Sequence, residues 1–114
     1  MSRAKTRSVA IRPARIRDIP AILALIDDNS DKILSRTEDE LRAIRKSFSV
    51  VVVSDEVVGC GCLEIYSKKI AEIRSVAIAA KHKGKGYGTI LMKSLLRRAR
   101  KLGIPEILVV TSNR

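Results

Sequence analysis

The chain has 114 residues, a length that suits a single domain. Hydrophobic residues make up 46% of it, enough for a core, yet no apolar run approaches the roughly 20 residues that a membrane-spanning helix needs. The formal net charge is +11, and residues 1–17 and 81–101 hold 14 of the 23 basic residues without any acidic one. Such a charge favours polyanionic partners, either nucleic acid or a small, multiply phosphorylated ligand.

The N-terminal part of the chain predicts a strand followed by two helices. Residues 8–15 alternate apolar and polar side chains, which is typical of a strand. Asp18 is placed to cap a helix whose first turn holds Pro20, where a missing N–H costs nothing. Thr37 and Glu40 have the spacing of a capping box and predict the start of the second helix.

Three consecutive strands are predicted next, at residues 49–54, 57–66 and 70–79. A turn at Asp55 and Glu56 joins the first two, although it lacks the usual glycine. A helix over 88–102 and a strand over 105–112 complete the order β-α-α-β-β-β-α-β. The final strand-helix-strand unit requires parallel strands and the hairpins antiparallel ones, so we expect an α+β fold with a mixed sheet.

The two cysteines, Cys60 and Cys62, lie in the second of these strands. Residues two apart on a strand share one face, a poor arrangement for a disulfide, and the single His82 offers little help to a metal site. We therefore expect two small buried residues and no bound metal. Free thiols, and a basic N-terminus without the apolar stretch of a secretory signal, predict a cytoplasmic location.

Three glycines alternate with Lys85 and Tyr87 in the stretch "KHKGKGYG" at 81–88, just before the last predicted helix. Free backbone N–H groups and the positive end of the helix dipole converge at such a place, and glycine lets a ligand approach the backbone closely. Lys83 and Lys85 add full charges. The loop predicts a cradle for phosphate or pyrophosphate. A flexible, solvated turn is the alternative, and the spacing matches neither a P-loop nor the dinucleotide fingerprint.

The stretch "EIRSVAIAAKHKGKGYGTILMKSLLRRARKLGI" resembles the acetyl-CoA-binding core of the GNAT family of N-acetyltransferases. The family's [QR]-x-x-G-x-[GA] signature falls on residues 83–88, with Lys83 where Gln or Arg is usual. The likeness covers residues 8–112 and implies an acetyltransferase domain over 8–114 after a basic tail at 1–7. The stretches "ILSRTEDEL", "FSVVVVSDEVVGCGCLEIY" and "AEIRSVAI" look, in order and spacing, like N-acetylglutamate synthase-type members.

The resemblance implies transfer of an acetyl group from acetyl-CoA, the cosubstrate, to a primary amine such as the α-amine of glutamate. It places Glu72 at the position of the glutamate that acts as general base in several members. The alternative is a strand-end glutamate paired with Arg74 or Lys69. It places Arg36 near the amino-acid substrate, the alternative being a solvated arginine before a helix cap. The cosubstrate would contact Val76, Ala77, Ile78, Lys83, Gly84, Lys85, Gly86, Tyr87, Gly88 and Thr89.

The family's general acid, commonly a tyrosine in the helix after the last predicted strand, has no match here. Tyr66 and Tyr87 lie elsewhere, which leaves Ser112, Asn113 or solvent. Typical members also continue with one more helix and two strands. Without them the last strand, which is apolar on both faces and would suit a buried position, is left as an open edge. We therefore expect either a homodimer through residues 106–112 or aggregation at high concentration.

Two other functions stay open at this stage. One is a CoA-binding protein that has lost catalysis together with a C-terminal part. The other is a basic nucleic-acid-binding module, which we do not favour because aromatic residues make up only 3% and base-stacking modules need them. No membrane partner is expected.

Overall fold

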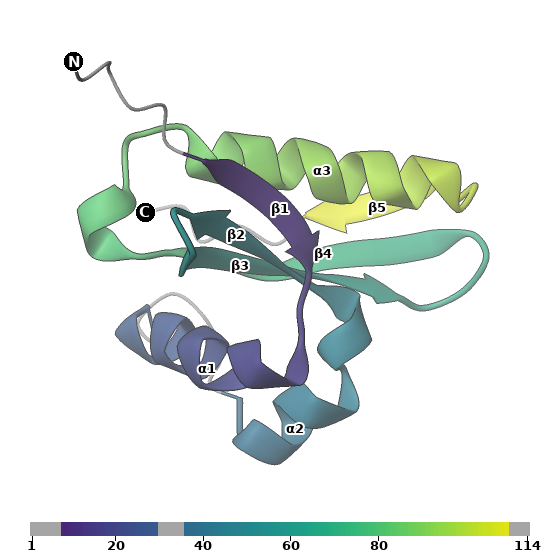
Figure 1. Ribbon diagram of the computed structural model, residues 1–114. Coiled ribbons are helices and arrows are strands. Elements are labelled where there is room, and N and C mark those ends of the chain that lie inside the picture. Colours follow the sequence, from purple (N-terminus) through teal and green to yellow (C-terminus); the bar gives the residue numbers. More distant parts are fainter. Residues whose placement is uncertain (1–7, 30–35, 110–114) are drawn as a thin grey trace.

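A computed structural model describes residues 8–29 and 36–109 (Figure 1). Its centre is a sheet with the order β1-β2-β3-β4-β5, formed by Val9–Pro13, Phe48–Val53, Glu56–Ile65, Ile70–Ile78 and Glu106–Val109. The first four strands are antiparallel and β5 runs parallel to β4, so the predicted mixed sheet and α+β class are confirmed. The predicted tail at 1–7 and the end of the last predicted strand lie outside the described residues.

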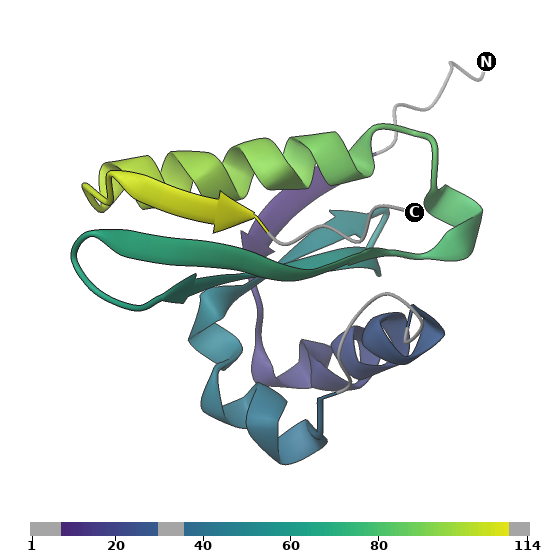
Figure 2. The same ribbon diagram turned by 180° about the vertical axis from the view of Figure 1, so that it is seen from behind.

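Helices cover both faces of this sheet (Figures 1 and 2). Helices α1 (Ile19–Asp28) and α2 (Glu38–Ala43) lie on one face, and α3 (Tyr87–Lys101) lies on the other. Short 3-10 turns η1, η2 and η3 occupy Ile16–Asp18, Arg45–Ser47 and Ala80–His82. Because strand side chains alternate between faces, two cores result: an α1-side core containing Ile22, Ile26, Phe48, Cys60 and Cys62, and an α3-side core containing Val51, Leu63, Ile73, Leu91 and Leu95.

The two predicted helix starts have different side-chain chemistry. At α2 the capping box is confirmed, because Thr37 Oγ1 accepts from the backbone N–H of Glu40 and Glu40 Oε1 accepts from that of Thr37. Asp18 does precede α1, but its carboxylate caps no N–H of that helix. It accepts instead from the Arg12 guanidinium and from the Arg15 backbone N–H, each at 2.7 Å. These bonds lower the pKa of Asp18 below its ordinary value.

The turn between β2 and β3 lies one residue earlier than predicted. Val53 pairs with Glu56, so Ser54 and Asp55 form the two-residue loop. Both have positive φ, at 49° and 69°. Positive φ at both central residues defines a type I′ turn, whose twist matches that of the strands it joins. This requirement explains how the hairpin closes without the expected glycine.

A bulge interrupts the pairing of β3 with β4. The register shifts between Cys60 and Cys62, so β4 contributes one residue more than β3. Gly61 therefore stands opposite both Ser75 and Val76, and Ser75 has a positive φ of 55°. An extra residue of this kind leaves backbone groups unpaired and redirects the side chains beside it.

The cysteines and the apolar edge formed by the last strand both follow the prediction. Cys60 and Cys62 are free and buried, and desolvation raises their pKa values to about 12 and about 11. In β5, Leu108 and Val109 are 47% and 42% exposed, so this apolar strand is uncovered among the described residues, as expected of an open edge. The cause is that β5 pairs only with β4 in the described sheet. No helix among the described residues is both long and apolar enough to cross a membrane.

Candidate functional site

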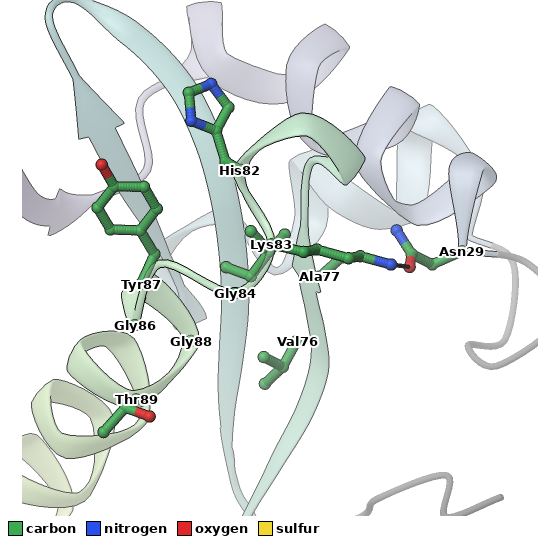
Figure 3. Close-up of a pocket in the computed structure, with 11 residues that line it drawn as sticks. Asn29, Val76, Ala77, His82, Lys83, Gly84, Gly86, Tyr87, Gly88 and Thr89 are labelled. Atoms are coloured by element: carbon green, nitrogen blue, oxygen red, sulfur yellow. Dashed lines mark hydrogen bonds between the residues drawn. The ribbon is translucent and has the colours of Figure 1, made fainter.

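A pocket of about 420 Å³ lies between the end of β4 and the start of α3 (Figure 3). Its lining comprises Asn29, Val76, Ala77, Ile78, His82, Lys83, Gly84, Gly86, Tyr87, Gly88 and Thr89. The structure thus brings together every residue that the sequence assigned to the cosubstrate except Lys85. Asn29 and His82 were not anticipated. Asn29 is the C-cap residue of α1 and lies 54 positions before Lys83, so no local pattern signals such a contact.

The loop glycines adopt backbone conformations that few other residues tolerate. Gly84 and Gly86 have φ values of 79° and 87°. A Cβ added to either would meet no atom within 4 Å, so the space above both is open to a ligand. Gly88 differs, since its φ is not positive and an added Cβ would only touch Ile78, at 3.8 Å. The cradle therefore depends on the first two glycines.

The N-terminus of α3 presents uncompensated backbone donors to this space. Gly86 is the N-cap residue, and no side chain caps the helix. The Ile90 N–H donates to the Gly86 carbonyl at 3.1 Å, whereas the N–H groups of the three residues before it have no partner within the helix. The first turn contains no acidic residue. The positive end of the helix dipole thus lies free beside the cradle, as anion binding requires.

Lys83 stands at the first position of the signature, where Gln or Arg is usual, and its side chain reaches across the pocket (Figure 3). Its Nζ donates to Asn29 Oδ1 at 3.3 Å, and the buried Asn29 donates through Nδ2 to the Leu25 carbonyl at 2.8 Å. The side chain thus links the loop to the C-terminal end of α1 instead of lying over the glycines. Lys83 still borders the pocket, whereas Lys85 does not line it.

An aromatic contact supports the loop from within. The ring of His82 is buried and lies 6.0 Å from the ring of Tyr87, which is itself buried. Neither nitrogen of His82 has a hydrogen-bond partner among the described residues. The two rings join η3 to the first turn of α3, so they hold the intervening glycines in place.

Glu72 lies on β4, half-buried and outside the pocket lining. Its Oε1 accepts a hydrogen bond from the Tyr66 hydroxyl, and this bond raises the pKa of Tyr66, so the phenol stays protonated at neutral pH. The Arg74 guanidinium binds Glu64 at 3.3 Å, and no ion pair joins Glu72 to Lys69 in the described part of the chain. The pairing considered as an alternative for Glu72 is therefore not observed, and Tyr66 is a partner that the sequence did not reveal.

Arg36 comes from the segment before α2 and contacts β4. Its Nε donates to Ser75 Oγ at 3.0 Å, and its guanidinium carbon lies 5.9 Å from the centre of the Phe48 ring. Arg36 is half-buried, so the alternative of a fully solvated arginine is wrong. The acid candidates Ser112 and Asn113 lie outside the described residues. Among the residues that the structure describes, no group of three or more His, Cys, Asp or Glu residues could hold a metal ion.

Comparison with known proteins identifies this arrangement. The model of the acetyltransferase (GNAT) family matches residues 18–114. The chain belongs to the GNAT family. Among its relatives are amino-acid acetyltransferases of Pasteurella multocida, 29% identical over 92% of this chain, and of Mycobacterium tuberculosis, 34% identical over 89%. The chain spans only 24% and 60% of the length of these two GNAT relatives.

Solved GNAT structures agree with this assignment. A Mycobacterium tuberculosis protein in complex with CoA and NLQ is 33% identical, with a TM-score of 0.86 over 90% of this chain and 64% of its own. N-acetylglutamate synthase of Neisseria gonorrhoeae, complexed with coenzyme A and N-acetyl-glutamate, is 29% identical. Its TM-score is 0.88, over 96% of this chain and 27% of its own.

Proposed function

We propose that this chain binds acetyl-CoA and transfers the acetyl group to the α-amine of an amino acid such as glutamate. The observation that carries the proposal is the uncapped N-terminus of α3, which opens onto the glycine cradle beside the bulged strand β4. The names of the relatives, amino-acid acetyltransferases, and the CoA complexes of two structural neighbours support it.

We assign two parts of CoA, the pyrophosphate and the pantetheine arm, to this pocket. The backbone N–H groups of residues 83–89 would bind the pyrophosphate, where the helix dipole and Lys83 add positive charge. The pantetheine arm would run along Val76, Ala77 and Ile78, which line the same pocket. The bulge at Ser75 and Val76 leaves backbone groups free of the sheet ladder. A free N–H there would bind the thioester oxygen and stabilise the charge that develops on it.

The reaction is a direct attack of the amine on the thioester. The amine nitrogen needs its lone pair, so it must first lose a proton, and Glu72 would accept that proton directly or through water. The C–N bond forms and the C–S bond breaks, so that CoA leaves as a thiolate. The nitrogen loses a second proton as the amide forms, and the thiolate takes up that proton, directly or through water, to become the thiol. The hydrogen bond from Tyr66 holds the Glu72 carboxylate in place for its part.

Arg36 would bind the carboxylate of the acceptor. A guanidinium offers two parallel N–H donors to a carboxylate, which fixes the acceptor in orientation as well as in position. The amino-acid acetyltransferase relatives and the neighbour holding N-acetyl-glutamate support an acceptor of this class.

We place the reaction in the cytoplasm, because the two thiols of β3 are free.

Calorimetric titration of the 114-residue chain with acetyl-CoA, CoA and a DNA duplex, each at two salt concentrations, tests the proposal. We expect binding of acetyl-CoA and CoA, with only weak and steeply salt-dependent binding of DNA. Release of CoA thiol in the presence of glutamate then tests catalysis. Binding without thiol release would favour a CoA-binding protein without activity. Tight DNA binding without CoA binding would favour the nucleic-acid module.

A further inference from the structure

Ser75 lies at the bulge of β4, where it has an unusual backbone conformation and accepts two hydrogen bonds. Its φ of 55° is unusual for a residue with a side chain. Its Oγ accepts a hydrogen bond from Arg36 Nε at 3.0 Å, and its carbonyl accepts one from the Cys60 thiol at 3.5 Å. Cys60 is buried, which raises its pKa to about 12, so the thiol keeps the proton that it donates. A strained backbone fixed in this way is typical of functional sites.

The bulge decides which face of the sheet Ser75 serves. Ile73 belongs to the α3-side core, and in a regular strand the residue two positions on would point the same way. The extra residue shifts this alternation, so Val76 packs against the α3-side core in its place. The hydroxyl of Ser75 reaches Arg36 instead, beside Phe48 of the α1-side core.

These contacts leave one part of Arg36 unused. Ser75 occupies Nε and the ring of Phe48 lies against the guanidinium. Neither terminal nitrogen of Arg36 makes a hydrogen bond or an ion pair within the described residues. The terminal N–H groups therefore form a fixed fork with the geometry that a carboxylate accepts.

We propose that Ser75 is a positioning residue that holds the Arg36 fork for the carboxylate of the acceptor. Because Ser75 and Val76 belong to one bulge, the same backbone distortion sets the acceptor's carboxylate and the thioester oxygen at a defined separation. The acceptor class follows: amino acids with a free carboxylate at the matching distance from the amine, and not amines without one. This inference rests on the proposed function.

The test compares two Ser→Gly substitutions and one rescue. Ser75→Gly removes the hydroxyl and relieves the positive φ. Ser54→Gly is the matched control, because Ser54 also has a positive φ, 49°, but lies in the exposed β2–β3 turn. Ser75→Asn keeps an acceptor oxygen and tolerates positive φ, so it should restore part of what Ser75→Gly loses.

Steady-state kinetics with L-glutamate give the first readout. Ser75→Gly should raise the KM for glutamate roughly tenfold, the expected effect of losing one hydrogen bond to a charged group, with kcat and the Kd of CoA unchanged. Ser54→Gly should change none of these. Glutamine and isoglutamine, which each lack one carboxylate, identify the group that Arg36 binds. The analogue without that carboxylate should show no difference between the parent and Ser75→Gly.

NMR of the Arg36 Nε–H gives a second readout that needs no turnover. Its exchange with water should be slow in the parent, fast in Ser75→Gly and slow again in Ser75→Asn. If Ser75→Gly made the Arg36 Nε–H exchange fast without any change in the KM for glutamate, the inference would be overturned and the proposed function would stay intact. Fast exchange of the Arg36 Nε–H in the parent would also overturn the inference. So would a rise in KM on Ser75→Gly substitution that is equal for glutamate, glutamine and isoglutamine. A chain that binds CoA but acetylates no carboxylate-bearing acceptor would refute both proposals together.

Discussion

At the scale of single residues, two carboxylates that face each other across β3 and β4 have different surroundings. Glu64 pairs with Glu72 in the register. Glu64 is neutralised by Arg74, whereas Glu72 accepts one hydrogen bond from the neutral Tyr66. The side chain of Glu72 thus forms no ion pair in the described structure, and this suits a proton acceptor better than an ion-paired carboxylate does.

Replacement of Glu72 by glutamine should slow acetyl transfer by a factor on the order of 10²–10⁴, because the amide cannot accept the proton. The affinity for acetyl-CoA should stay the same, and a higher pH should recover part of the rate because more of the amine is then neutral. Glu64→Gln is the matched control and should retain far more activity. A pH–rate profile that is identical in the parent and in Glu72→Gln would exclude Glu72 from the mechanism.

The ion pair of Asp18 with Arg12 predicts how stability depends on pH. The pKa of Asp18 is lowered in the folded state, first by the hydrogen bond from Arg12. Its contribution is therefore present above the unfolded pKa of about 3.8 and is lost as the pH falls through the folded pKa. Asp18→Asn should lower the free energy of unfolding by about 3 kcal/mol at pH 7, and by less at pH 3, where the unfolded chain is already largely protonated.

Urea unfolding at both pH values measures this difference. Asp28→Asn, at an exposed position of α1, serves as the control and should change stability little at either pH. An Asp18→Asn effect of equal size at pH 7 and pH 3 would contradict the linkage.

At the scale of elements, the two ends of α3 allow a matched test of the cradle. Gly86 at its start and Gly103 just beyond its end both have positive φ, and an added Cβ at either meets no atom within 4 Å. Valine at each position should therefore cost a similar amount of stability, about 1–3 kcal/mol. Only Gly86→Val should weaken acetyl-CoA binding, by more than tenfold, because its side chain would fill the space of the pyrophosphate.

Calorimetric titration of both variants, after circular dichroism has shown that they fold, separates strain from binding. Equal affinity for acetyl-CoA in Gly86→Val and the parent would show that the anion binds elsewhere. A similar loss of affinity in Gly103→Val would show that the effect comes from strain alone.

The elements that were predicted correctly carry their signals locally. The capping box of Thr37, the glycines before α3 and the alternation in β1 each lie within a few neighbouring residues. The features that were missed depend on pairing. The β4 bulge arises from its register with β3, and the Arg36–Ser75 bond joins residues 39 positions apart. Asn29 likewise enters the pocket through the fold, so the glycine loop before α3 was predictable from the local sequence, whereas these long-range contacts were not.

At the scale of the whole molecule, the sheet has two open edges among the described residues. Strand β5 exposes Leu108 and Val109, and strand β1 at the opposite edge exposes Val9 to 40%. Self-association of the 114-residue chain through β5 stays a prediction. Val109→Lys should shift the chain towards monomer, because a charge on an edge strand opposes pairing. Val9→Lys is the control for the other edge.

Light scattering over a range of concentrations measures this association. A parent chain that stays monomeric at high concentration would refute it. A shift caused by Val9→Lys but not by Val109→Lys would assign the contact to β1 instead.

The dipole of helix α3 is balanced by charged side chains at only one of its two ends. Arg98, Arg100 and Lys101 lie in its last turn and complement the negative end of its dipole, whereas no acid lies in its first turn. A bound anion supplies the missing counter-charge. The folded state then gains RT ln(1 + [L]/Kd), about 4 kcal/mol when the ligand is a thousandfold above Kd. We therefore expect that in a cell molecules without cosubstrate would unfold more often and reach proteases, so the abundance of this protein would follow the supply of acetyl-CoA.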